Sequence, residues 1–447
     1  MAYLQKFGKV ILDFANTKNE TPVPQFYKDA FLNWYGCTLA GAYAKMVDAA
    51  ANTFKAEGTN NVLPPVGRTE HLDIPKTVQI DCLSSACLAY DDIHFETTLH
   101  PAGPVLAAIL GVARTQKVSG KEALQAFRSG MEVECRTALA MFSKNTDTSK
   151  CWYPTGVTGG IGAAVAAGQL LNLNAGQMES AIGLAAGYSS GTRGTHGAMS
   201  GSWVPSIAAE AGYVSAKMAK NGFTATINSL TGGNGLFNAI NPTGDFEKAF
   251  EGIGQNYICE TTACKPYPFG FISFAVIKCC LDLHKELEKH NANIDKVTVY
   301  VSPTALTLGK NPTPTSIYQA MVSLRYIVGR VISNPHLAFV PLDDDFTISE
   351  NISKIMEHVS ICEDASLRND QAHCSAVLSD GTALEVKCDV APSAPGNPLT
   401  TADVEEKFML QAEKALNKQA ADALLDIFHK LEEIDDISIL IKLPVQK

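Results

Sequence analysis

The sequence predicts an α+β protein, in which a large all-α helical domain is interrupted by a smaller inserted α+β lid domain. Apolar residues recur at helical spacing through Tyr27–Asn256, between breaks of Gly, Pro and Asn. After Lys265 they alternate with polar residues, as in half-buried strands, and helical spacing returns from Ala402. The predicted domains are residues 1–266 plus 402–447 for the helical domain and 267–401 for the lid domain.

Helices are expected wherever the apolar spacing of the first domain is uninterrupted. The run Gly162–Ala167 is almost entirely Ala and Gly, which lets neighbouring helices approach closely. Asn174 followed by Gln177 has the spacing of a capping box, which predicts a further helix start. The other predicted helices are Pro24–Ala40, Val78–Ala89, Pro104–Thr115, Gly120–Ala140, Gly160–Leu171 and Ser206–Asn221.

The second domain carries strand and hairpin patterns. Ile294–Val301 alternates apolar and polar residues, which predicts a half-buried strand. Asp380 and Gly381 predict a hairpin turn between two strands. The flanking strands are Ser375–Leu378 and Ala383–Val390, a third strand is Val359–Cys362, and helices are predicted at Phe274–His290, Thr315–Val331 and Ala402–Leu431, with a final strand or docking tail at Ile437–Leu443.

Composition excludes several classes of protein. With 46% hydrophobic and 18% charged residues, the 447-residue chain is expected to be globular rather than disordered. A net charge of −10 argues against nucleic acid as a partner, because phosphate binding needs clustered Lys and Arg. No signal peptide and no run of roughly 20 apolar residues is present, so we expect neither secretion nor a membrane partner. The twelve cysteines show no CxxC spacing, which favours reduced thiols in a cytoplasmic protein and no metal site.

Two polar stretches of the helical domain are candidates for a site. Tyr90–Pro101 holds Asp92, His94 and His100, which could bind a ligand, form a weak metal site or lie in a solvated loop. Thr155 and Gly156 precede the Ala/Gly-rich helix, where backbone N–H groups can bind a carboxylate or serve only as a helix cap.

Three further groups are ambiguous on sequence grounds. The glycine-studded stretch Gly191–Trp203 carries Arg193 and His196 and is either a mobile loop near the site or an inert connector. Lys265 precedes a Pro-Tyr-Pro hinge where the domain character changes, a place where ligand clefts are common. Arg325 lies in an apolar helix pattern and needs an anionic partner, either a substrate carboxylate or an internal carboxylate.

Five stretches in order resemble the MmgE/PrpD family over nearly the whole chain: YDDIH…HPAGPV, PTGVTGGIGAAVAAGQLLNLN, AAEAGYVSAKMAKNGFTA, KPYP and SLRYIVG. The resemblance implies a small polycarboxylic acid as substrate and a site between the helical domain and the lid domain. It also implies a homodimer and no metal or organic cofactor.

The resemblance transfers to individual residues only in part. It assigns His100, Lys265 and Tyr326 to positions that are functional in the family. At several other positions this sequence departs from the family's usual residue. Tyr153 replaces a His, Gly201 a Lys, Val204 a His and Ala89 an Asp, and Phe274 lies near the place of a further His.

The residues that remain suit proton exchange beside a carboxylate. We expect Tyr153 and Lys265 to act as two bases on opposite faces of the substrate, which requires lowered pKa values for both. His100 would stabilise the intermediate. The expected reaction is cofactor-independent epimerisation of iminodisuccinate; the alternatives are a dehydratase or decarboxylase of a tricarboxylic acid such as 2-methylcitrate or cis-aconitate, and a non-catalytic polycarboxylate-binding homologue. The expected substrate-binding residues are Asp92, His94, Thr155, Gly156, Arg325 and Tyr326.

Overall fold

A computed structural model describes residues 2–19, 21–55, 63–143, 146 and 149–442. The chain divides into two compact units. The helical unit comprises Met1–Cys87, Asp91–Thr262 and Thr400–Lys447, and the α+β unit comprises Leu88–Tyr90 and Ala263–Leu399. The fold is therefore mixed and predominantly helical.

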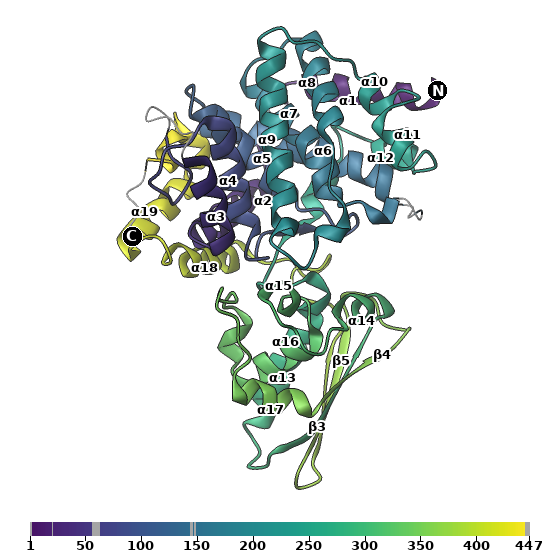
Figure 1. The fold of residues 1–447 in the computed structure, drawn as a ribbon, viewed down its shortest axis with the longest axis vertical. Helices are drawn as coiled ribbons and strands as arrows, with labels where there is room; N and C mark the ends of the chain where they lie inside the picture. Colours follow the sequence, from purple (N-terminus) through teal and green to yellow (C-terminus); the bar gives the residue numbers. More distant parts are fainter. Residues whose placement is uncertain (1, 20, 56–62, 144–145, 147–148, 443–447) are drawn as a thin grey trace. The chain divides into compact units, whose positions relative to one another are not determined.

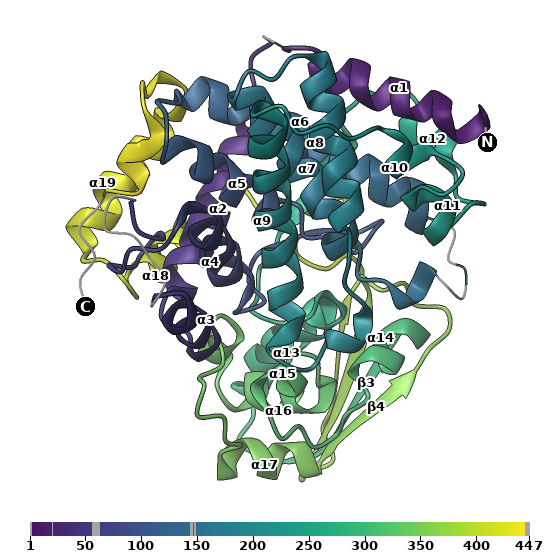
Figure 2. The ribbon, with the colours of Figure 1, turned by 45° about the horizontal axis from the view of Figure 1, so that its top comes forward.

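The core of the helical unit is built around helix α7 (Pro154–Leu170), which packs against α5 (Ala102–Ala113), α6 (Gly120–Phe142), α8 (Ala175–Tyr188) and α9 (Ser200–Lys220) (Figures 1 and 2). The α7–α9 contact is close because small residues line it. A Cβ atom on Gly212 of α9 would lie 2.5 Å from the backbone oxygen of Gly160. Glycine is therefore required at this crossing.

Shorter and peripheral helices complete the helical unit. The C-terminal segment returns to it, since α18 packs on α2 and the buried Lys407 ammonium donates to Asn33 Oδ1 at 2.6 Å. The predicted capping box at Asn174 and Gln177 is confirmed at the start of α8. The remaining helices of this unit are α1 (Ala2–Asn16), α2 (Gln25–Gly41), α3 (Lys45–Lys55), α4 (Ile74–Ala86), α10 (Asn228–Thr231), α11 (Leu236–Ile240), α12 (Phe246–Phe250), α18 (Thr401–Ala412) and α19 (Lys418–His429).

The α+β unit contains a four-stranded sheet of order β4-β3-β5-β6. Strand β3 pairs in parallel with β4 and antiparallel with β5, and the predicted hairpin joins β5 to β6. Helix α13 packs on β5 and β6, and α16 packs on α13, α17 and β4. The elements are α13 (Phe274–Leu287), β3 (Ile294–Val301), α14 (Pro303–Gly309), α15 (Ile317–Ala320), α16 (Leu324–Ser333), α17 (Glu350–Glu357), β4 (Val359–Glu363), β5 (Ala372–Leu378) and β6 (Ala383–Cys388).

Several predicted boundaries were wrong because side chains stop or start helices there. Helix α7 begins at Pro154 rather than Gly160, since proline suits the first helical turn. The single helix predicted at Thr315–Val331 is two helices, because Ser323 caps the start of α16. Asn417 caps α19 in the same way and splits the predicted C-terminal helix. Ile437–Leu440 is a short 3₁₀ turn rather than a strand, and Leu443 lies outside the described residues.

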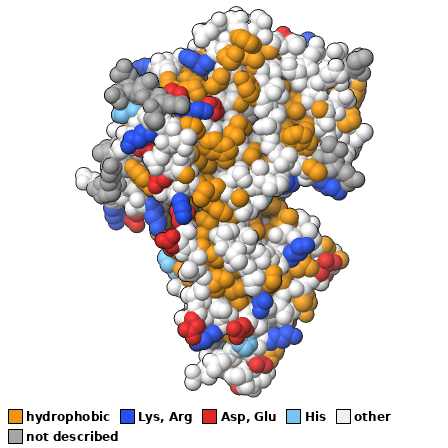
Figure 3. All heavy atoms as spheres, in the orientation of Figure 1, with side chains coloured by type: hydrophobic (Ala, Val, Ile, Leu, Met, Phe, Trp, Pro, Cys, Tyr) orange, Lys and Arg blue, Asp and Glu red, His pale blue; other side chains and the backbone are white. Residues whose placement is uncertain are grey.

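Charged side chains of both signs are visible on one face of the molecule. On the face drawn in Figure 3, basic and acidic side chains lie among one another, separated by hydrophobic and uncharged groups. This distribution does not form the basic stripe that binds nucleic acid. Within the described part of the chain, no helix has both the length and the apolar character needed to cross a membrane.

The close α7–α9 crossing predicts that a larger side chain at Gly212 destabilises the protein. Gly212→Ala should destabilise the protein by about 1–3 kcal/mol, because the added methyl group would overlap backbone atoms of α7. Gly187→Ala in α8 is the matched control, because nothing lies within 4 Å of the added Cβ, and it should be neutral or slightly stabilising. Thermal unfolding of both variants tests this; equal melting temperatures would contradict the close crossing.

Candidate functional site

His100 is held at the start of α5 by the residues that precede it. Its ring Nδ1 hydrogen-bonds the backbone oxygen of Asp92 and lies 3.6 Å from Asp91 Oδ2. Because a carbonyl oxygen only accepts, Nδ1 carries the hydrogen and Nε2 remains to exchange a proton. Asp92 Oδ2 in turn accepts from the Ala102 N–H at 2.9 Å, which places this carboxylate at the positive end of α5. Asp92 thus fixes both the helix and the imidazole.

Tyr153 and Thr155 reach the same place from the start of α7. Thr155 Oγ1 accepts from the backbone N–H of His100 at 3.0 Å, and the hydroxyls of Thr155 and Tyr153 are hydrogen-bonded. The rings of His100 and Tyr153 lie 6.3 Å apart, centre to centre. Since the Thr155 oxygen already accepts from His100, its own hydrogen can go to the Tyr153 oxygen. The phenol hydrogen is then available to a ligand.

The glycine-studded loop before α9 completes this cluster. Gly191 accepts from the Tyr153 N–H at 3.1 Å, and the His196 ring lies 4.7 Å from the Tyr153 ring. His196 Nδ1 donates to the Arg193 carbonyl at 2.9 Å, and Arg193 Nη2 donates to Thr98 Oγ1 at 3.0 Å. From the sequence, this loop could be either an inert connector or a mobile loop near the site. The structure brings both of its basic residues to Tyr153.

The expected lowering of the Tyr153 pKa is wrong. Burial raises the pKa of the Tyr153 phenol, and the negative charge of Asp91 adds to this effect. The hydrogen bond from Thr155 and the charge of Arg193 oppose the rise without cancelling it. Tyr153 is therefore a neutral phenol near pH 7, suited to donating a proton or a hydrogen bond rather than to removing a proton.

Glu134 of α6 is a buried acid that the sequence analysis missed. Its side chain is fully buried, and neither carboxyl oxygen has a hydrogen-bond partner among the described residues. Burial raises the pKa of Glu134 well above its ordinary range, and the charge of Asp92 raises it further. A Cβ on Gly162 of α7 would lie 3.1 Å from Glu134 Oε2, so the carboxyl group lies against the α6–α7 contact. A glutamate between Val133 and Cys135 in a long buried helix is the signal that could have found it.

His94 and Gly156 lie in the helical unit and are both buried. His94 Nδ1 hydrogen-bonds the Thr97 hydroxyl at 2.8 Å, and burial lowers the pKa of the imidazole, so this histidine is neutral. Gly156 lies in the first turn of α7, where a Cβ would be 2.5 Å from the Ser190 oxygen. The first contact is internal to the loop before α5, and the second shows that the backbone at Ser190 lies close against α7.

Three of the predicted site residues belong to the α+β unit. Lys265 is buried and directly follows β2 (Thr262–Cys264). Arg325 is half-buried, and its Nε donates to the Met356 oxygen at 2.8 Å, at the last turn of α17. This carbonyl at a helix C-terminus replaces the anionic partner that the sequence suggested. Tyr326 is buried, and its hydroxyl accepts from Arg330 Nη1 at 3.2 Å.

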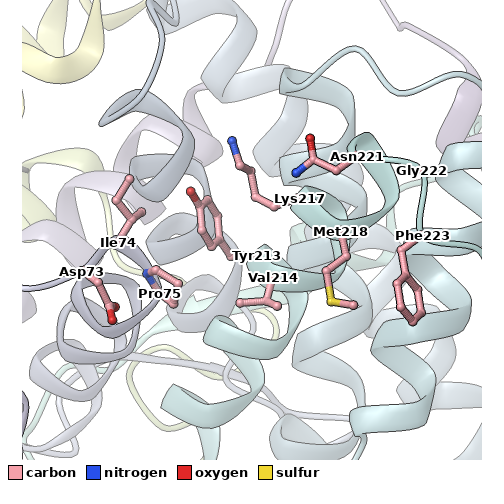
Figure 4. Close-up of a pocket in the computed structure, with 10 residues that line it drawn as sticks. All are labelled: Asp73, Ile74, Pro75, Tyr213, Val214, Lys217, Met218, Asn221, Gly222 and Phe223. Atoms are coloured by element: carbon pink, nitrogen blue, oxygen red, sulfur yellow. The ribbon is translucent and has the colours of Figure 1, made fainter. Parts of the chain in front are cut away.

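A separate pocket of about 730 Å³ lies between the start of α4 and the end of α9 (Figure 4). Its walls are mostly apolar, and the Asp73 carboxylate at its edge caps α4 by accepting from the Lys76 N–H. None of the predicted site residues lines it. The residues that line it are Asp73, Ile74, Pro75, Tyr213, Val214, Lys217, Met218, Asn221, Gly222 and Phe223.

The cluster also has the geometry to hold a cation. One ligand atom each from Asp91, Asp92 and His100 lie within 4.8 Å of one another. The same groups make the internal hydrogen bonds described above, which also account for their positions. Their proximity is therefore explained by the helix start alone.

An acid–base cluster at two helix N-termini can transfer protons and bind an anion. Comparison with known families then identifies the family of the chain. The MmgE/PrpD N-terminal domain matches residues 5–249, and the MmgE/PrpD C-terminal domain matches residues 267–433. The chain belongs to the MmgE/PrpD family.

Two relatives are named cis-aconitate decarboxylase, and a third is named as a protein like it. Human cis-aconitate decarboxylase is 24% identical over 437 residues, which cover 94% of this chain and 89% of the human protein. Mouse cis-aconitate decarboxylase is 24% identical over 385 residues, covering 79% and 75% of the two chains. A cis-aconitate decarboxylase-like protein of Aspergillus oryzae is 26% identical over 170 residues, covering 36% and 35%.

The raised pKa of Glu134 predicts a pH-dependent stability. Above about pH 4.5, the ordinary pKa, an unfolded chain releases this proton while the folded chain keeps it. The free energy of unfolding therefore falls progressively as pH rises from that value toward the folded-state pKa of Glu134. Glu134→Gln removes this loss, so the melting temperature of the variant should rise relative to that of the wild type as pH increases above about 4.5.

Glu247→Gln provides the control, because it removes the same charge from an exposed side chain of the same unit. Its melting temperature should run parallel to that of the wild type across the pH range. A Glu134→Gln curve that is also parallel would show that Glu134 is ionised in the folded protein.

Proposed function

We propose that this protein is a lyase that removes carbon dioxide or water from a small tricarboxylic acid such as cis-aconitate or 2-methylcitrate. The observation that carries the proposal is the hydrogen-bonded set of His100, Thr155 and Tyr153, in which the phenol is held neutral by burial. Such a set donates protons, which is what a carbanion or a departing hydroxyl requires. The names of the human and mouse relatives point to the same reaction class.

The proton inventory of a decarboxylation fits this cluster. When the C–C bond to a carboxylate breaks, carbon dioxide leaves and the bonding electrons stay on the substrate carbon. An imidazolium at His100 can deliver its Nε2 proton to that carbon, and solvent then restores the proton. Asp91 Oδ2 lies 3.6 Å from the His100 ring, and Tyr153 can donate a hydrogen bond to a substrate carboxylate that shares the negative charge of the carbanion.

The remaining predicted residues take supporting parts in this proposal. The first-turn N–H groups near Thr155 and Gly156 would bind a carboxylate, and Asp92 would position His100. Lys265, in the α+β unit, stays a predicted proton-transfer group. His94, Arg325 and Tyr326 are further expected contributors, and they would act by holding their loops and helices in place.

Epimerisation of iminodisuccinate is the second candidate. Tyr153 is favourable to it, because it stands where the family usually has a histidine. A two-base epimerase must however remove a proton with one of its two groups, and burial raises the Tyr153 pKa against that task. We therefore place the lyase first. A cytoplasmic homodimer is part of the same proposal, and light scattering on the purified protein would test the dimer.

The two reactions are separated by one NMR experiment. Chelator-treated protein is incubated in D₂O with cis-aconitate, 2-methylcitrate and iminodisuccinate. A lyase releases carbon dioxide or water from a tricarboxylate, and a decarboxylase also places one deuterium on the product carbon. Deuterium entering iminodisuccinate, with no reaction of either tricarboxylate, would contradict the lyase and support the epimerase. Binding without any reaction would support a non-catalytic role.

A further inference from the structure

The acidic residues of the cluster in the helical unit repel any polycarboxylate ligand. Asp91 and Asp92 are both buried beside His100, and the whole chain has a net charge of −10. A ligand with two or three negative charges approaches these carboxylates against their field. The site therefore needs a fixed positive charge close to Tyr153 and His100.

Arg193 is placed to supply this charge. Its guanidinium interacts electrostatically with the Tyr153 phenol, and one of its five N–H donors binds the Thr98 hydroxyl. Among the described residues no carboxylate pairs with Arg193. Three other arginines of the helical unit are already paired with acids, and the fourth, Arg128, donates to Thr21 and to the Asn19 oxygen. The pairs are Arg68 with Asp48 and Glu70, Arg114 with Asp81, and Arg136 with Glu132.

The loop that carries Arg193 is held in a defined conformation. A backbone bridge joins Thr192 to Trp152, next to Tyr153, and His196 donates to the Arg193 carbonyl. Gly191 has φ +100°, and a Cβ there would lie 2.4 Å from Val204 Cγ1, so only glycine fits this turn. These contacts orient Arg193 before any ligand binds, which reduces the entropy that binding costs.

We propose that Arg193 binds a carboxylate of the substrate, and that it selects acids whose additional carboxylate lies beside the reacting carbon. This inference rests on the proposed function for the reacting group and adds the residue that recognises the rest of the substrate. A guanidinium presents two parallel N–H groups that match a carboxylate, and it stays charged at any physiological pH. Arg193 is exposed, so a ligand can reach its guanidinium directly.

The test is the affinity and turnover of Arg193→Gln in the full-length protein. Calorimetry measures binding of cis-aconitate and of tricarballylate, an unreactive saturated tricarboxylate. Loss of a charge-assisted, bidentate contact should weaken both about 10- to 100-fold. The KM should rise by a similar factor while kcat changes less, because the contact is made in the bound substrate as well as in the transition state. Arg193→Lys should restore part of the affinity, because it keeps the charge without the bidentate geometry.

Arg368→Gln is the matched control, since it removes the same charge from an exposed arginine of the α+β unit that pairs with Asp370. It should leave affinity unchanged. Wild-type affinity in Arg193→Gln, or no binding of either probe to the wild type, would overturn the proposed role of Arg193. Arg193-dependent binding of tricarballylate without turnover of any tricarboxylate would instead overturn the lyase and leave the role of Arg193 standing.

Discussion

The double use of Asp92 is the constraint on which the site depends. Its carboxylate accepts from the Ala102 N–H at the start of α5, and its carbonyl receives the His100 Nδ1 hydrogen. The same histidine is tied to α7 through its backbone N–H and the Thr155 hydroxyl. One short segment thus joins two helix N-termini and fixes the tautomer of the imidazole. The positive ends of both helices face the region where a carboxylate would lie.

This arrangement places Asp91 and Asp92 beside the proposed carboxylate site, and the balance of charge explains several otherwise unrelated features. Glu134 can remain buried without a partner because its raised pKa keeps it neutral. Tyr153 is kept neutral by burial and by Asp91. Arg193, on a loop shaped by Gly191, interacts with Tyr153. The cluster thus combines two neutral acids, Glu134 and Tyr153, with a guanidinium near the carboxylates of Asp91 and Asp92, which suits the proposed proton donation to an anionic substrate.

Local signals predicted much of the fold and part of the site. Strand β3, the hairpin at Asp380–Gly381 and the capping box at Asn174 follow from spacing and turn chemistry, and each is present. The family motifs identified the stretches that carry His100 and Tyr153. Helix starts set by single capping residues, such as Ser323, were missed because the apolar pattern continues across them.

The surroundings of each ionisable side chain in the cluster could not be predicted from the sequence. The pKa of Tyr153 depends on burial and on Asp91, which is 62 positions earlier in the chain, so the expected depression was wrong. Arg193 and His196 approach Tyr153 only because the backbone of their loop pairs with the residues before α7. Glu134 was hidden among the apolar residues of α6, and its raised pKa depends first on its burial and then on the charge of Asp92. These are long-range neighbours, for which local spacing carries no signal.

The position of the ring hydrogen on His100 is the most direct test of whether the Asp92 carbonyl holds this imidazole. In protein labelled with ¹⁵N at histidine, the NMR shifts of the two ring nitrogens report which one carries the hydrogen in the neutral form. The account predicts the Nδ1–H tautomer for His100, assigned by comparison with His100→Gln, because the Asp92 carbonyl can only accept. The Nε2–H tautomer would show that Asp92 does not hold the ring, and it would remove the proton-donor arrangement on which the proposed reaction is built.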